Sequence, residues 1–140
     1  MADVLDAYKI LVKRVFLLLK EQGFPFKKDG FNFRWIDETS RPKVAFVVNF
    51  QRSAFGTRDH ISFTVNVGVL MTYGNDPIPP KLKEYECPIR KRPASWTAKY
   101  DCDKWWDITE ETDPEALYQE MRALTLEYIL PFFEKYRVSG

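Results

Sequence analysis

Strict alternation of apolar and polar residues between Ile61 and Val69 is the sequence feature that most limits the fold of this chain. Large apolar residues occupy the odd-numbered positions of this run, whereas Ser62, Thr64 and Asn66 lie at even-numbered ones. Side chains on a β-strand point to opposite faces in turn, so this segment has one apolar and one polar face. We therefore predict an antiparallel strand whose apolar face is buried and whose polar face meets water.

The segments before this run predict two more strands of the same kind. Phe31–Trp35 and Val44–Gln51 alternate between apolar and more polar residues, and a polar stretch ending in Pro42 separates them. The link to the next strand contains Gly56 and is short enough for a hairpin. We therefore expect three antiparallel strands in consecutive order.

Two shorter strands are predicted farther along the chain. Tyr85, Cys87 and Ile89 share one parity and charged residues share the other, which predicts a fourth strand; Pro88 within it favours an edge position or a bulge. The region 93–108 is aromatic yet charged. Its end, around residues 105–108, is expected to form a fifth short strand.

Helical periodicity predicts one helix toward each end of the chain. Apolar residues recur on one stripe from Asp3 to Gln22, after which Gly23 suits a left-handed cap and Pro25 prevents continuation. Near the other end, Thr112–Glu115 combines capping side chains with an early proline and precedes a second apolar stripe. Pro131 is expected to kink or end that helix.

Together these elements predict a single α+β domain over residues 1–140. A chain of 140 residues, 45% of them hydrophobic, is long enough to bury one sizeable core. We expect two layers: a sheet of four to five mostly antiparallel strands, with the N- and C-terminal helices packed on one of its faces.

Charge and hydropathy argue against several classes of partner. The chain has 21 basic and 20 acidic residues, and a net charge of +1 is too small to attract nucleic acid or anionic lipid through the overall field. The strand aromatics fall on the apolar parity, where they cannot stack on bases. The longest apolar stretch near the start, Val15–Leu19, is too short for a membrane span or an export signal. We therefore expect a cytoplasmic protein with no membrane and no nucleic-acid partner.

The polar parities of the predicted strands form a candidate binding surface. Forked guanidinium groups and amides give directional contacts, and indole rings supply apolar contact area. An ordinary solvated sheet face with a few structural amides is the alternative interpretation. The Ser62 and Thr64 hydroxyls lie on this face, and its candidate ligand- or partner-binding residues are Arg34, Asn49, Gln51, Ser53, Asn66, Arg90, Arg92, Trp105 and Trp106.

Patterns for catalysis and metal binding are weak. A nucleophilic cysteine needs a general base, and the single histidine, His60, follows a predicted turn. Cys87 and Cys102 are interpreted as packed thiols rather than as a disulfide. Asp101, Cys102, Asp103 and His60 lack the close repeated spacing of a zinc site, so we predict no metal and no cofactor.

A series of short motifs resembles a known bacterial family. In this order and spacing, which cover nearly the whole chain, the motifs resemble the family called domain of unknown function 4304. The resemblance implies no activity and no catalytic residues. The motifs are a helix ending in Gly23-Phe24, then Gln51-x-Ser53, Asn66-x-Gly68, Glu86-Cys87-x-Ile89-Arg90, Trp105-Trp106, and a last helix running into Pro131-Phe132-Phe133.

Two functional hypotheses of different classes follow. The preferred one is a cytosolic binding or interaction module that holds an unknown protein or small-molecule ligand on the polar sheet face and the double-Trp region. The alternative is a small enzyme of unknown reaction, centred near Cys87, Arg90 and His60.

Overall fold

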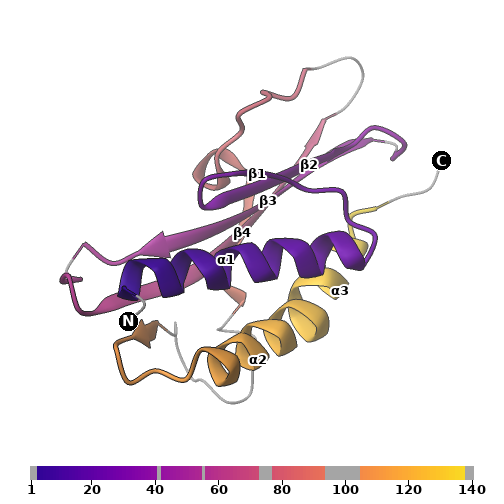
Figure 1. Ribbon diagram of the computed structural model, residues 1–140. Helices are drawn as coiled ribbons and strands as arrows, with labels where there is room; N and C mark the ends of the chain where they lie inside the picture. Colours follow the sequence, from indigo (N-terminus) through magenta and orange to yellow (C-terminus); the bar gives the residue numbers. More distant parts are fainter. Residues whose placement is uncertain (1–2, 41, 55, 73–76, 94–104, 138–140) are drawn as a thin grey trace.

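The computed structural model is an antiparallel sheet with a layer of helices on one face (Figure 1). It describes residues 3–40, 42–54, 56–72, 77–93 and 105–137. The strands are β1 (Lys27–Asp29), β2 (Asn32–Asp37), β3 (Lys43–Arg52), β4 (Ile61–Thr72), β5 (Ile89–Lys91) and β6 (Trp106–Ile108). The helical elements are α1 (Val4–Glu21), the 3-10 helix η1 (Glu84–Glu86), α2 (Pro114–Leu124), the π-helical turn η3 (Thr125–Ile129) and α3 (Leu130–Glu134). The predicted α+β class is confirmed.

Strand order follows the order of the chain. β1 to β5 pair consecutively, every pair is antiparallel, and β6 joins the far edge of β4 beside β5. Within β4 the odd-numbered residues Phe63, Val65 and Val67 are buried in the main core. The alternation between Ile61 and Val69 therefore sets which face of the sheet meets the helices.

Capping residues mark where the helices begin and end. The Asp3 carboxylate caps α1 by accepting a hydrogen bond from the Leu5 amide at 3.0 Å, and Asp113 caps α2 in the same way. Gly23 follows α1 with φ +88°, the left-handed conformation that glycine adopts most easily. Figure 1 shows α1, α2 and α3 lying on the same side of the sheet. Their apolar faces and that side of the sheet form one core.

Pro131 neither ends nor sharply redirects the C-terminal helix. α2 passes into η3, whose wider turn runs from Thr125 to Ile129, and α3 continues from Leu130 with Pro131 in its first turn. A proline lacks the N–H that a regular α-turn would use, and an i→i+5 turn before it absorbs the missing hydrogen bond. Phe132 and Phe133 are thereby kept in the core.

The predicted strand over residues 85–89 is wrong in its first half. Residues 84–86 form η1, and β5 begins only at Ile89, directly after Pro88. The Glu86 carboxylate accepts a hydrogen bond from the Lys83 amide at 2.8 Å, which favours a turn over an extended chain. We call residues 78–87 the strap, because they lie across the sheet face opposite the helices.

The strap also corrects the expectation that this face meets water throughout. Leu82 and Cys87 pack on Ala45 and Val47, forming a second, smaller hydrophobic cluster. A Cβ added to Gly68 would lie 2.7 Å from the Cys87 Sγ, so the chain approaches closely at this glycine. No helix in the described part of the chain is both long enough and apolar enough to cross a membrane.

Candidate functional site

Three asparagines lie side by side across the middle of the sheet face that bears the strap. Asn32 on β2 is opposite Asn49 on β3, which is opposite Asn66 on β4. The Asn66 Nδ2 donates to the Asn49 Oδ1 at 3.1 Å and to the Gln51 Oε1 at 2.8 Å. The Asn49 Nδ2 donates to the Asn32 Oδ1 at 2.9 Å. We call these four residues, Asn32, Asn49, Gln51 and Asn66, the amide row.

Arg92 anchors one end of the amide row. Its Nε donates to the Asn66 Oδ1 at 3.0 Å, and its guanidinium lies 5.5 Å from the centre of the Trp105 ring. All hydrogen bonds along the row therefore run in one direction, from a cation outward through successive amides. Chains of this kind polarise one another, so each bond strengthens the next.

Burial divides the amide row into an anchor and a contact surface. Asn66 is only 4% exposed, and both protons of its amide and its oxygen are already engaged. Asn32 and Asn49 are half-buried, whereas Gln51 is exposed. The Asn32 and Gln51 oxygens each accept a bond from within the row, which leaves their N–H groups as donors that the row itself does not use.

Arg34 and Arg90 contact the strap and β1 rather than the amide row. The Arg34 Nε donates to the Leu82 carbonyl and its Nη1 to the Asp29 carboxylate at 3.0 Å. The Arg90 Nε donates to the buried Glu84 carboxylate at 2.8 Å. Both guanidiniums therefore help to hold the strap or its neighbours, in addition to any contact with a ligand.

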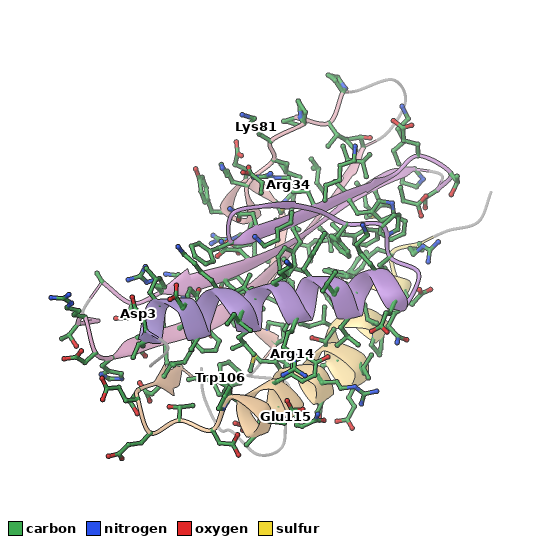
Figure 2. The ribbon with its side chains drawn as sticks, in the orientation of Figure 1. Asp3, Arg14, Arg34, Lys81, Trp106 and Glu115 are labelled. Atoms are coloured by element: carbon green, nitrogen blue, oxygen red, sulfur yellow. The ribbon has the colours of Figure 1, made fainter. Side chains whose placement is uncertain are left out.

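The two tryptophans belong to different parts of the molecule. Trp105 is half-buried beside Arg92, but Trp106 is 4% exposed and its ring lies 5.9 Å from that of Phe63 in the main core. Figure 2 shows Trp106 beneath α1. The prediction of a double-Trp binding region is therefore corrected, because adjacent residues of an extended chain point to opposite faces. Ser53 lies just beyond β3, where its amide donates to the Ser62 carbonyl at 2.7 Å.

The structure does not assemble the enzyme centre considered from the sequence. Cys87 lies against Gly68, whereas His60 precedes β4. His60 and Gly68 are eight residues apart along an extended strand, which corresponds to about 26 Å. Burial, followed by the nearby Glu84 and Glu86 charges, raises the pKa of the Cys87 thiol to about 12, which makes it a poor nucleophile. The His60 Nε2 instead lies 2.7 Å from the Asp107 carboxylate across the β4–β6 pair.

Metal ligation finds no support within the described ranges. No three His, Cys, Asp or Glu side chains gather there in a group that could hold an ion. Asp101, Cys102 and Asp103 lie outside these ranges.

Asn32 is the member of the amide row that the sequence analysis missed. It shares the polar parity of Arg34 and lies between the half-buried Phe31 and the buried Phe33, so the alternation in Phe31–Trp35 already indicated its face. The predicted pairing placed Asn49, Gln51 and Asn66 on one face, and the structure brings these three together.

Comparison with known proteins identifies a family but assigns no activity to the chain. No curated protein and no solved structure matches the chain. The family model described as Domain of unknown function (DUF4304) matches residues 17–135, which include every strand and the whole amide row. The chain therefore belongs to the DUF4304 family.

Proposed function

We propose that this domain is a binding module that recognises a ligand or partner through the amide row. The observation that carries the proposal is the direction of the hydrogen bonds: Arg92 donates to Asn66, and the chain of bonds ends at Asn32 and Gln51, whose N–H groups the row does not use. Side chains held in place by their neighbours lose little conformational entropy on binding, which favours affinity.

The geometry favours a ligand rich in hydrogen-bond acceptors. Donors at the ends of the row that the row does not use suit carbonyl or carboxylate oxygens, and the positive charge of Arg92 strengthens those donors through the intervening amides. Trp105 adds an apolar ring at the margin of the same surface. We also propose that the domain acts in the cytosol, as the sequence analysis expected.

Affinity capture with matched variants tests the proposal. The double variant Asn32→Ala/Gln51→Ala removes the donors at the ends of the row, while the control Gln119→Ala removes an exposed amide on α2. Wild-type protein and the control should retain the same molecule from a native lysate, identified by mass spectrometry of proteins and small molecules. The double variant should retain at least tenfold less.

Two checks decide the outcome. Circular dichroism and a thermal melt must show that the double variant is folded, since the row also links three strands. Amide side-chain NMR signals of Asn32 and Gln51 should shift when the captured molecule is added to the wild type. Equal capture by the double variant, or a captured molecule that leaves these signals unmoved, would overturn the proposal.

A further inference from the structure

A pocket of about 400 Å³ lies at the end of β1, beside Arg34. Three cationic residues line it: Lys27, Lys28 and Arg34. None of the amide-row residues is among its lining residues. This pocket is therefore a site separate from the amide row.

The Arg34 guanidinium is held rigidly but is only partly satisfied. The Leu82 carbonyl and the Asp29 carboxylate engage Nε and Nη1, and the side chain is 11% exposed. Its Nη2 is buried and has no hydrogen-bond acceptor among the described residues. A buried donor without an acceptor is costly, and most so on a charged group, so native structures rarely leave one without a bound water, ion or ligand.

The charge around the pocket favours an anion. Lys27 and Lys28 are exposed at its rim. Asp29 is already paired with Arg34, which, together with Lys83 and Lys81, lowers the pKa of its carboxyl. Figure 2 shows Lys81 at the same end of the molecule as Arg34. The pocket lining therefore holds three cations, Lys27, Lys28 and Arg34, against the two acidic residues Asp29 and Glu38, and Lys81 and Lys83 add positive charge near Asp29.

The apolar part of the lining indicates that the anionic group belongs to an organic molecule. Pro25, Ile36 and Pro80 contribute apolar surface to the same pocket. Pockets of a few hundred cubic ångströms with mostly apolar walls and a few fixed polar groups are typical of small-molecule sites. A volume of about 400 Å³ accommodates a small organic molecule rather than a lone ion.

We propose that this pocket binds a small organic oxyanion, a carboxylate or a phosphate ester, whose oxygens accept hydrogen bonds from Arg34 and are flanked by Lys27 and Lys28. Guanidinium N–H groups bind carboxylate and phosphate oxygens strongly, and the Nη2 of Arg34 is the group left without an acceptor. The hydrocarbon part of the ligand packs on Pro25, Ile36 and Pro80.

NMR titration at constant ionic strength, with benzoate in one arm and inorganic phosphate in the other, tests the site. We expect saturable shifts of the Arg34 Nε–H signal and of the Lys27 and Lys28 amides. The arm that saturates at lower concentration identifies the favoured anion. The Lys27→Ala/Lys28→Ala variant, which changes only exposed side chains, should weaken binding about tenfold.

Two further variants separate the site from general charge attraction. Arg34→Lys keeps the charge but loses the fork, so it should weaken binding at least tenfold, whereas Lys9→Ala/Lys13→Ala on the exposed side of α1 should leave binding unchanged. Absence of saturable shifts with both probes, or equal weakening by the two double-lysine variants, would overturn the proposal. The Asn32→Ala/Gln51→Ala variant should bind as the wild type does, so this site and the amide row can fail independently.

Discussion

At the scale of single residues, Tyr8 carries a hydroxyl into the main core without an evident partner. Tyr8 is fully buried, its ring packs against Phe31 and Phe63 at 5.0 and 5.3 Å, and its hydroxyl has no hydrogen-bond acceptor or donor among the described residues. Burial therefore raises the pKa of this phenol well above its usual range, despite the opposing charge of Arg52.

Removal of the Tyr8 hydroxyl should therefore not destabilise the protein. A buried unsatisfied polar group costs about 1–3 kcal/mol, so we expect Tyr8→Phe to raise the free energy of unfolding by up to about 1 kcal/mol in a urea titration. Tyr85→Phe is the matched control, since Tyr85 is 67% exposed and should change stability little. A loss of more than about 1 kcal/mol for Tyr8→Phe would show that the hydroxyl is satisfied in solution.

Residue parity was the part of the site that the sequence predicted well. Asn49, Gln51 and Asn66 share a face because a half-buried strand fixes every second side chain. The same rule applied to Trp106 and Ile108, which flank the charged Asp107, indicates that Trp106 points into the core. The error arose because two adjacent tryptophans were treated as one surface.

At the scale of elements, an ion pair between a buried carboxylate, Asp37, and an exposed guanidinium, Arg137, joins the end of β2 to the residues after α3. The Asp37 carboxylate, 5% exposed, accepts hydrogen bonds from the Thr39 amide and hydroxyl and from the Arg137 Nε at 3.2 Å. Burial alone would raise its pKa, but the hydrogen bonds from Thr39 and Arg137 outweigh burial and lower it. Arg137 also lies 4.9 Å from the centre of the Trp35 ring.

This ion pair makes a pH-dependent contribution to stability. Because the pKa of Asp37 is lowered in the folded state, the stabilisation is fully present above the unfolded pKa of about 4 and is lost as pH falls through the folded value. We expect Asp37→Asn to destabilise the protein at pH 7 and to flatten its loss of unfolding free energy between about pH 5 and pH 2, followed by urea titrations.

Arg137→Ala supplies the complementary measurement. Loss of the guanidinium should raise the pKa of Asp37, measured by carboxyl-carbon NMR, and move the acid transition to higher pH. An unchanged Asp37 pKa in that variant would show that Thr39 alone stabilises the carboxylate.

Elements with strong periodicity were predicted closely, and those without it were not. α1 and the long strands β3 and β4 have clear repeats and recognisable caps or links. β1 is three exposed residues, Lys27–Asp29, with no apolar alternation, so only its pairing with β2 defines it. Residues 84–86 alternate like a strand, but the local hydrogen bond from Lys83 to Glu86 favours η1.

At the scale of the whole molecule, the sheet separates two unequal hydrophobic clusters. The main core lies under the helices, and the smaller one holds the strap through Leu82 and Cys87. No pattern in residues 78–87 predicts this contact, because the apolar residues there are isolated among prolines and charges and their partners are distant in sequence. Sequence periodicity therefore could not predict that the strap covers part of this sheet face.

The strap should loosen without unfolding the rest of the protein. Leu82→Ala removes a buried apolar side chain of the strap, and it should destabilise the smaller cluster by roughly 2–3 kcal/mol. We expect faster hydrogen exchange in residues 82–87 and faster thiol labelling of Cys87, with little change in exchange within β3. Leu124→Ala in the main core is the control and should lower protection throughout the sheet. Uniformly faster exchange in Leu82→Ala would show that both clusters melt together.

The helical layer joins parts of the chain that are far apart in sequence: Arg14 on α1 pairs with Glu115 on α2, 101 residues away. This separation has a consequence for synthesis on the ribosome. β1 to β5 pair with their neighbours in the chain, but the helical layer needs both α1 and α2. Until Pro114–Leu124 has left the exit tunnel, the nascent sheet has α1 alone to cover its aromatic side. A chain arrested before that point would present an apolar surface to chaperones, and release of the last helices would end that exposure.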